Sequence, residues 1–281
     1  MIKIENLNKN YGEKQVIHNI NLEIKKGELC GFIGPNGAGK TTIMKILTCL
    51  LKPGSGNVYI KNFSVIDSPI DVKRHIGYLP ENSSLYEDMT INQYLEFFSE
   101  IYGMNKKISK KRVLELLNDL GLNERADENI SSLSNGMKRK VAIIRAILHD
   151  PEVLIFDEPT VNLDPITSSS VRKFMKELQR KGKTIFFSTH NLYEVESICE
   201  RIVMINKGKI ILDGTIDELK DKFGEHVLVK FKKDNKIQSV RIDKKSVAKC
   251  IEQLSDGGEV ISINREFDFE DIFEKLVEDG G

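Results

Sequence analysis

Gly34-Pro35-Asn36-Gly37-Ala38-Gly39-Lys40-Thr41-Thr42 joins the apolar run Leu29–Ile33 to a segment with helical periodicity. From Gly34 to Thr41 the spacing fits a motif that is typical of phosphate-binding loops. Glycines let successive backbone N–H groups turn toward a polyphosphate, and the following helix adds its partial positive charge. Lys40 would add a full positive charge, and Thr41 a hydroxyl ligand for magnesium. We therefore predict an α/β fold with a phosphate-binding loop between a strand and a helix.

A pair of acidic residues follows a second apolar run. Val153–Phe156 suits a buried parallel strand, and Asp157 and Glu158 come directly after it. Parallel α/β sheets bind ligands at the carboxyl ends of their strands, so we expect both side chains near the phosphate loop. Asp157 is the candidate magnesium ligand, directly or through water. Glu158 is the candidate for orienting or deprotonating the attacking water, and two surface acids without such a role are the alternative.

A histidine, His190, ends a third apolar run, Thr184–Thr189. Histidines in such places are often structural. We nevertheless predict a catalytic role, because a parallel strand here would bring His190 to the same sheet edge as Asp157.

Leu133-Ser134-Asn135-Gly136-Met137 reads as a polar turn that opens an amphipathic helix. Because it lies between the phosphate loop and Leu154–Thr160, the chain resembles the ATP-binding cassette (ABC) family, whose signature is normally Leu-Ser-Gly-Gly-Gln. Asn135 replaces the first Gly, and Met137 replaces the Gln. Asn enters the left-handed backbone region readily and its amide can donate a hydrogen bond, so we expect the protein to tolerate Asn135. The resemblance covers about residues 2–220.

The resemblance implies an ATP site shared by two cassettes that dimerise head to tail. Its implied ATP-binding residues are Tyr11 (stacking on adenine), Gly34, Pro35, Asn36, Gly37, Ala38, Gly39, Lys40, Thr41, Thr42, Glu81, Asp164 and, across the dimer, Ser134, Asn135 and Gly136. The implied metal ligands are Thr41, Asp157 and Glu81, and the catalytic residues are Glu158, His190 and Lys40. Glu81 stands where most members have Gln; its carboxylate can approach magnesium, but its duty is left open.

The chain divides into two predicted domains. Residues 1–224 combine an N-terminal antiparallel β subdomain, a P-loop NTPase core and an inserted helical subdomain at about 88–149, in which Thr90 and Gln93 form a capping box. Residues 225–281 read as a small α+β domain with strands near 227–231, 236–242 and 260–263. Two helices are expected to join these strands, and the final one carries Phe269, Ile272, Phe273 and Leu276 on one face, with Asp268 as N-cap.

Composition narrows the classes of partner. Lys+Arg 42 balances Asp+Glu 42, whereas nucleic-acid-binding proteins usually carry a basic excess. The run Lys138-Arg139-Lys140 is interpreted as a solvated helix face. Cys30, Cys49, Cys199 and Cys250 form no Cys-x-x-Cys pair, so we expect reduced thiols. Because no apolar run reaches the ~18 residues of a membrane span, we expect the span to come from another polypeptide.

The predicted function is that of the ATP-hydrolysing subunit of an ABC transporter. It would use ATP and magnesium, pair with a second cassette and a membrane permease, and lie peripherally on the cytoplasmic side of the membrane. Glu81, Leu85–Thr90, Lys138–Lys140 and residues 267–273 look most similar to exporter-type cassettes. The alternatives are an importer ATPase, a soluble ABC ATPase acting on ribosomes or DNA, and a non-catalytic regulator. Zero net charge weighs against nucleic acid, and intact Lys40 and Glu158 weigh against the regulator.

Overall fold

The computed structural model describes residues 1–223, 226–233, 236–243, 246, 249–252, 259–266 and 273. The chain forms two compact units, Met1–Asp213 and Gly214–Gly281. The first unit ends before the boundary predicted after residue 224, because the helix α8 (Ile216–Phe223) groups with the second unit.

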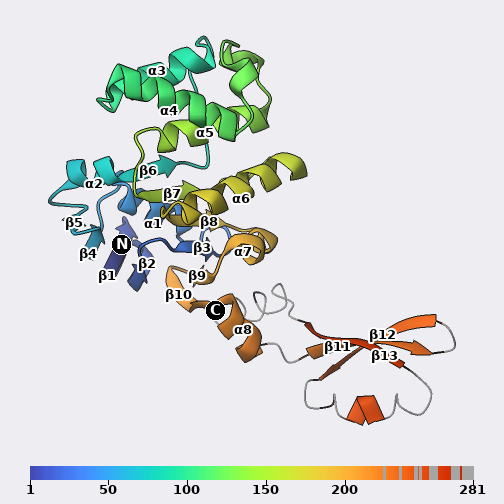
Figure 1. The fold of residues 1–281 in the computed structure, drawn as a ribbon. Coiled ribbons are helices and arrows are strands. Elements are labelled where there is room, and N and C mark those ends of the chain that lie inside the picture. Colours follow the sequence, from blue (N-terminus) through green and yellow to red (C-terminus); the bar gives the residue numbers. More distant parts are fainter. Residues whose placement is uncertain are drawn as a thin grey trace. The chain divides into compact units, whose positions relative to one another are not determined.

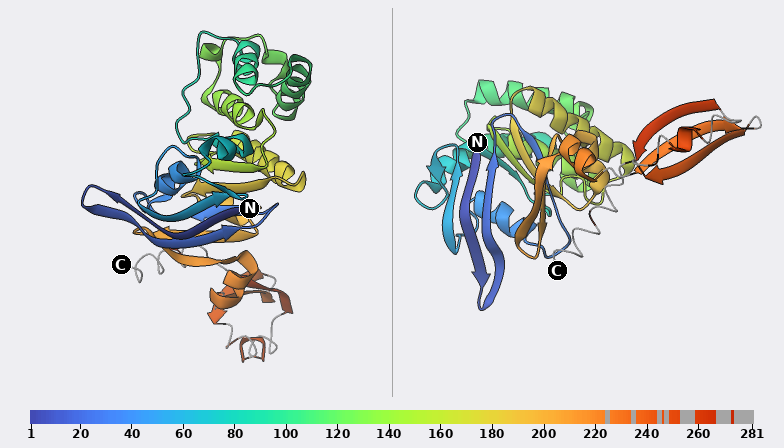
Figure 2. Two further views of the ribbon diagram at one scale, coloured as in Figure 1. Left: turned by 90° about the vertical axis from the view of Figure 1, so that its left-hand side faces the viewer. Right: turned by 90° about the horizontal axis from the view of Figure 1, so that it is seen from below.

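Two sheets build the first unit (Figures 1 and 2). The N-terminal antiparallel sheet has the order β2-β1-β4-β5, with strands β1 (Ile2–Tyr11), β2 (Lys14–Ile24), β4 (Ser55–Ile60) and β5 (Phe63–Ser64). The larger sheet has the order β10-β9-β3-β8-β7-β6, with strands β3 (Leu29–Ile33), β6 (Ile76–Leu79), β7 (Val153–Asp157), β8 (Thr184–Thr189), β9 (Arg201–Asn206) and β10 (Lys209–Thr215). Neighbours from β9 to β6 are parallel, as predicted for the strands that carry Asp157 and His190.

Helix α1 (Lys40–Leu47) lies between the two sheets and contacts β4 of one and β7 of the other. Ile43, Met44, Ile46 and Leu47 are fully buried in the core that the sheets share. The apolar spacing would place Leu50 on the same helix face, but α1 ends at Leu47 and Leu50 is 60% exposed. The chain leaves the helix here because Cys49 has a positive φ of 57°.

Three helices form the predicted helical subdomain: α3 (Ile91–Ile101), α4 (Lys106–Asp119) and α5 (Asn135–Ile147), which contact one another (Figure 1). The capping box of Thr90 and Gln93 is present at the start of α3. Asn105 caps α4 by accepting a hydrogen bond from the backbone N–H of Lys107 at 2.9 Å, so this helix begins before Ser109, the residue that its sequence suggests as a start. Helix α5 contacts β6, which joins this subdomain to the larger sheet.

The remaining helices of the first unit are α2 (Pro69–His75), α6 (Pro165–Arg180) and α7 (Leu192–Ile198). Helix α6 makes the predicted crossover between β7 and β8, and α6 and α7 both contact β8. Helices α2 and α7 and strand β10 are short elements that the sequence reading did not include. All four cysteines are free, as expected. Within the described residues, no helix is long and apolar enough to cross a membrane.

The second unit contains an antiparallel sheet of order β12-β11-β13, with β11 (His226–Lys233), β12 (Lys236–Asp243) and β13 (Glu259–Glu266). These strands overlap the three predicted ones. Val229 and Phe231 on β11 are buried. One of the two predicted helices is present as a helical turn at residues 249–252. The predicted final helix lies outside the described residues, apart from helical Phe273.

Candidate functional site

The site forms where β3, β7 and β8 end. Parallel pairing places Ile33 beside Thr189 and Asp157 beside Ser188, so the phosphate loop, the acidic pair and His190 leave the sheet at one edge. A cavity of about 320 Å³ lies there. Its lining includes Val16, Pro35, Asn36, Gly37, Gly39, Lys40, Thr41, Thr42, Glu81, Glu158 and His190. The structure therefore brings most of the predicted phosphate-site and catalytic residues together.

Glycine geometry shapes the phosphate loop. Gly37 and Gly39 have φ values of 79° and 111°, in the region that favours glycine, and Gly39 directly precedes α1. Lys40 is 7% exposed, and its Nζ donates to the carbonyls of Gly34 at 2.6 Å and Pro35 at 3.3 Å. Burial lowers the pKa of Lys40, an effect that the nearby carboxylates, Glu158 foremost, oppose. The ammonium is thus held at the loop by weak neutral acceptors, which a phosphate oxygen can replace.

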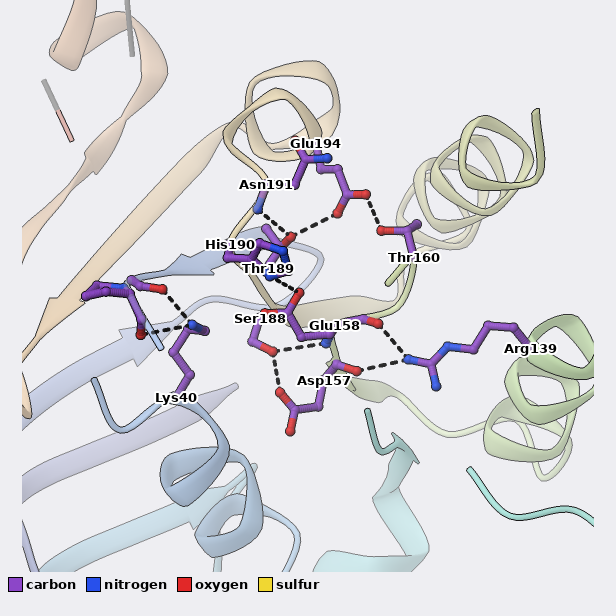
Figure 3. Close-up of polar contacts among 12 residues, drawn as sticks. Lys40, Arg139, Asp157, Glu158, Thr160, Ser188, Thr189, His190, Asn191 and Glu194 are labelled. Carbon is purple, nitrogen blue, oxygen red and sulfur yellow. Dashed lines mark hydrogen bonds and ion pairs between the residues drawn. The ribbon is translucent and has the colours of Figure 1, made fainter. Parts of the chain in front are cut away.

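Asp157 is buried, and one of its carboxylate oxygens accepts a short hydrogen bond from the hydroxyl of Ser188 (Figure 3). The Ser188 hydroxyl also accepts from the backbone N–H of Glu158 at 3.1 Å. One residue of β8 therefore fixes both members of the acidic pair. Its hydrogen bonds to Asp157 and Glu158 could not be read from the apolar pattern that predicted the strand.

Glu158 lies just beyond β7 with φ of 48°, a left-handed conformation that is uncommon for residues other than glycine. Its backbone N–H donates to the carbonyl and hydroxyl of Ser188, each at 3.1 Å. Its carboxylate Oε2 lies 3.0 Å from Nδ1 of His190 (Figure 3). The strained backbone turns Glu158 toward the phosphate loop, where a carboxylate can accept a proton from water.

Arg139 contradicts the interpretation of Lys138–Lys140 as a solvated helix face. Its side chain is 7% exposed and points from α5 to the ends of β6 and β7. The guanidinium donates to the backbone carbonyls of Pro80, Glu81, Asp157, Glu158 and Pro159. Burial lowers the pKa of Arg139 to about 10, with the carboxylate of Asp157 as the chief opposing influence. A charged run in sequence does not reveal that its middle member is buried.

A second buried residue that sequence reasoning missed is Glu194, on α7, which is 3% exposed. It accepts hydrogen bonds from the hydroxyls of Thr160 and of Thr189, the latter at 3.0 Å (Figure 3). Its carboxylate also lies 3.7 Å from the guanidinium of Arg172. Thr160 follows the acidic pair and Thr189 precedes His190. Glu194 therefore connects the two segments that carry the candidate catalytic residues.

The signature residues lie at the start of α5, not in the phosphate-loop cavity. Ser134 caps the helix by accepting from the backbone N–H of Met137 at 3.3 Å. Asn135 is the exposed first residue of the right-handed helix, so the left-handed conformation from which we argued its tolerance is not used. Gly136 is buried, and a Cβ there would lie 3.0 Å from the Thr167 side chain. The first N–H groups of any helix lack partners within the helix, and Ser134 accepts from only one of them. The start of α5 therefore favours a bound anion.

Tyr11 and Asp164, which were also predicted to bind ATP, do not line the cavity. Tyr11, at the end of β1, is 49% exposed, with the ammonium of Lys9 5.8 Å from its ring centre. Asp164 caps α6 by accepting from the backbone N–H groups of Ile166 and Thr167 at 3.0 and 2.9 Å. A hydrogen bond from the Thr167 side chain, followed by the backbone hydrogen bond from Thr167, lowers the pKa of the Asp164 carboxyl.

The donor set suits magnesium bound together with a nucleotide. Thr41 and Glu81 line the cavity beside the buried end of β7 that carries Asp157. Among the described residues there is no cluster of three or more His, Cys, Asp or Glu side chains able to hold a metal. Magnesium in phosphate sites takes one or two carboxylates and completes its shell with phosphate and water, so a sparse set of side chains fits it.

These features define a P-loop ATPase of the cassette type. Residues 17–161 match the ABC transporter family model, and the chain belongs to this family. It is 37% identical over 229 residues to the linearmycin resistance ATP-binding protein LnrL of Bacillus subtilis, covering 82% of this chain and 74% of the relative. An uncharacterized ABC transporter ATP-binding protein of Methanocaldococcus jannaschii is 33% identical over 97% of both chains. The choline transport ATP-binding protein OpuBA of Bacillus subtilis is 37% identical over 78% of this chain and 58% of its own length.

Solved cassettes share the fold. An ATP-binding subunit of an ABC transporter superposes with a TM-score of 0.73 at 32% identity, covering 80% of this chain and 93% of that structure. A dimeric cassette in a post-hydrolysis state, bound to ADP and phosphate, gives a TM-score of 0.70 at 30% identity over 77% and 99% of the two chains. The protein is thus an ABC transporter ATP-binding subunit with ATPase activity, and its fold class is the one predicted.

Proposed function

We propose that this ATPase drives export of a small molecule through a separate membrane permease, to which it binds on the cytoplasmic side. The similarity to a protein named for linearmycin resistance supports export, since removing a compound from the cell confers resistance to it. Two cassettes, in a homodimer or a heterodimer, would enclose ATP head to tail. In that arrangement Ser134, Asn135 and Gly136 of one cassette face the γ-phosphate held by the phosphate loop of the other.

The observation that carries the proposed chemistry is the contact between Glu158 and His190 at the mouth of the phosphate-loop cavity. Glu158 would orient and deprotonate the attacking water, and His190 would contact the γ-phosphate. Lys40 would neutralise charge on the phosphates. Thr41, Asp157 and Glu81 would hold magnesium, directly or through water, and Tyr11 would stack on adenine.

An aromatic surface on the helical subdomain suits a protein partner. Tyr86, before α3, packs edge-on against Phe97 of α3 with ring centres 5.8 Å apart. Tyr86 is 52% exposed and Phe97 is 37% exposed. Exposed apolar groups that cluster in this way are typical of interaction sites. We assign this surface to the permease.

Uptake is the second candidate function, because the relative named for choline transport is as similar to this chain as the one named for resistance. The direction can be measured with a membrane permease that co-purifies with this chain. We expect inside-out vesicles containing both proteins to accumulate linearmycin when ATP is added, and vesicles carrying Glu158→Gln not to do so. ATP-dependent accumulation of choline only by right-side-out vesicles, loaded internally with ATP, would contradict export.

A further inference from the structure

Arg139 is a buried charge whose guanidinium contacts backbone oxygens of two separate segments. Nη1 donates to Pro80 at 2.7 Å and Glu81 at 2.9 Å, in the loop after β6. Nη2 donates to Asp157 at 3.0 Å and Glu158 at 2.7 Å, at the end of β7. Nε donates to the carbonyl of Pro159 at 3.0 Å. Arginine has five N–H donors in a rigid planar fork, and here five carbonyls from two loops surround that fork.

Each of these loops carries a carboxylate that lines the phosphate-loop cavity, Glu81 in one and Glu158 in the other. The backbone of Glu158 is held from both sides: its N–H donates to Ser188 and its C=O accepts from Arg139. Its φ of 48° is a conformation that persists only where surrounding contacts enforce it. The hydrogen bond from Arg139 to the Glu158 carbonyl is one of these contacts, and it comes from a helix of another subdomain.

We propose that Arg139 is a positioning residue through which helix α5 sets the backbone of Glu158 and of the loop that carries Glu81. The same helix is capped by Ser134, the residue assigned to a second cassette's ATP. A shift of α5 on dimer closure is therefore transmitted by the guanidinium to the carboxylate that activates water. This inference rests on the proposed catalytic role of Glu158.

The first test separates positioning from binding in the purified full-length chain. Arg139→Lys keeps the charge but has only three donors on one atom, and Arg139→Gln keeps two donors in a plane. Because a displacement of about 1 Å can cost on the order of 100-fold in rate, we expect kcat to fall at least ~10-fold in both variants. The dissociation constant for ATP should change by no more than about threefold, since the phosphate loop is untouched.

The control is Lys138→Met on the same helix turn, where Lys138 pairs with Glu87 at 2.6 Å on the surface. We expect its kcat to stay near that of the unmodified chain, because exposed ion pairs contribute little. Unchanged kcat in both Arg139 variants would overturn the proposal. So would a parallel loss of ATP binding and kcat in both, which would assign Arg139 to holding the fold together.

A double-mutant cycle links the effect to Glu158. If Arg139 acts through that carboxylate, Arg139→Lys should slow the Glu158→Gln chain by no more than about twofold, although it slows the unmodified chain strongly. Equal slowing in both backgrounds would show that Arg139 acts elsewhere and would overturn the inference. Unmodified turnover in Glu158→Gln alone would instead remove the catalytic role of Glu158, so the two failures are distinguishable.

Discussion

Nδ1 of His190 lies 3.0 Å from Oε2 of Glu158, and this contact joins the ends of two neighbouring strands at the phosphate loop. It exists because β7 and β8 pair in register, with Asp157 opposite Ser188, so the residues that follow them leave the sheet together. His190 can orient the Glu158 carboxylate while remaining available to a phosphate, since its side chain is 57% exposed.

Glu158→Gln should abolish most ATP turnover while preserving ATP binding. The amide keeps the shape of the carboxylate but cannot accept a proton from water, so we expect kcat to fall by about 100-fold or more. Phosphate release and equilibrium ATP binding measure the two effects separately. Turnover within about twofold of the unmodified chain would remove Glu158 from the mechanism.

Asn135→Asp should change stability and activity in opposite directions. Asn135 is exposed at the first position of α5, where a negative charge interacts favourably with the helix dipole and adds about 0.3–1 kcal/mol. The same charge would repel the γ-phosphate of a facing cassette, so we expect ATPase activity to fall at least ~10-fold. Thermal melting measures the change in stability, and phosphate release measures the change in ATPase activity.

Asn135→Gly is the matched control, since it restores the usual residue of the ABC signature and should keep activity. Equal turnover in the Asp and Gly variants would show that this position does not face phosphate.

Glu194→Gln should destabilise the first unit. The amide leaves Arg172 without its nearby carboxylate, in a site where Glu194 is 3% exposed. Weakening this buried network should cost about 1–3 kcal/mol, which lowers Tm by roughly 2–10 °C in a domain of this size. Glu196→Gln, on the exposed side of the same helix, is the control and should leave Tm unchanged. Equal melting of both variants would show that Glu194 contributes no net stability.

A site residue could be predicted from the sequence where the signal for it lies within a short stretch of the chain. The phosphate loop and the acidic pair were predictable, because glycine spacing and an apolar strand followed by acids are read within a few residues. Arg139 and Glu194 were not, since their acceptors and donors come from loops far away in the chain. Charge and polarity give the same sequence signal on a solvated face as in a buried network. Only the tertiary pairing of β6, β7 and β8 distinguishes the two cases.

Asn135 shows a different limit. The left-handed argument came from comparing it with the glycine of the usual signature, yet α5 already includes Asn135 as a right-handed residue. The residue type indicates which backbone conformations Asn135 can adopt, whereas the cap at Ser134 determines that it adopts the helical one. The short helix α7 escaped for a related reason, because helical periodicity needs more than its seven residues.

His149, just beyond α5, gives the chain a pH-dependent stability. Its Nε2 donates to the carbonyl of Ile76 at 3.0 Å, whereas its buried Nδ1 has no hydrogen-bond partner among the described residues. The ring packs against Tyr102 with centres 4.2 Å apart. Burial lowers the pKa of His149 below 6.5, and the Ile76 hydrogen bond and nearby Asp150 only partly oppose this shift.

The direction of this pH dependence follows from when the unfolded and the folded chain bind a proton at His149. Below about pH 6.5 the unfolded chain protonates this histidine while the folded chain still resists, so the free energy of unfolding falls as pH drops and is unaffected above that range. Lys183, which pairs with Asp150 at 2.8 Å, also disfavours a second charge here. Between pH 7.5 and 5.5 we expect the unmodified chain to lose more stability than His149→Gln, by at most about 1 kcal/mol, because the glutamine cannot be protonated and can still donate to Ile76. Urea unfolding at both pH values measures the difference, and an equal loss in the two chains would exclude His149 as its source.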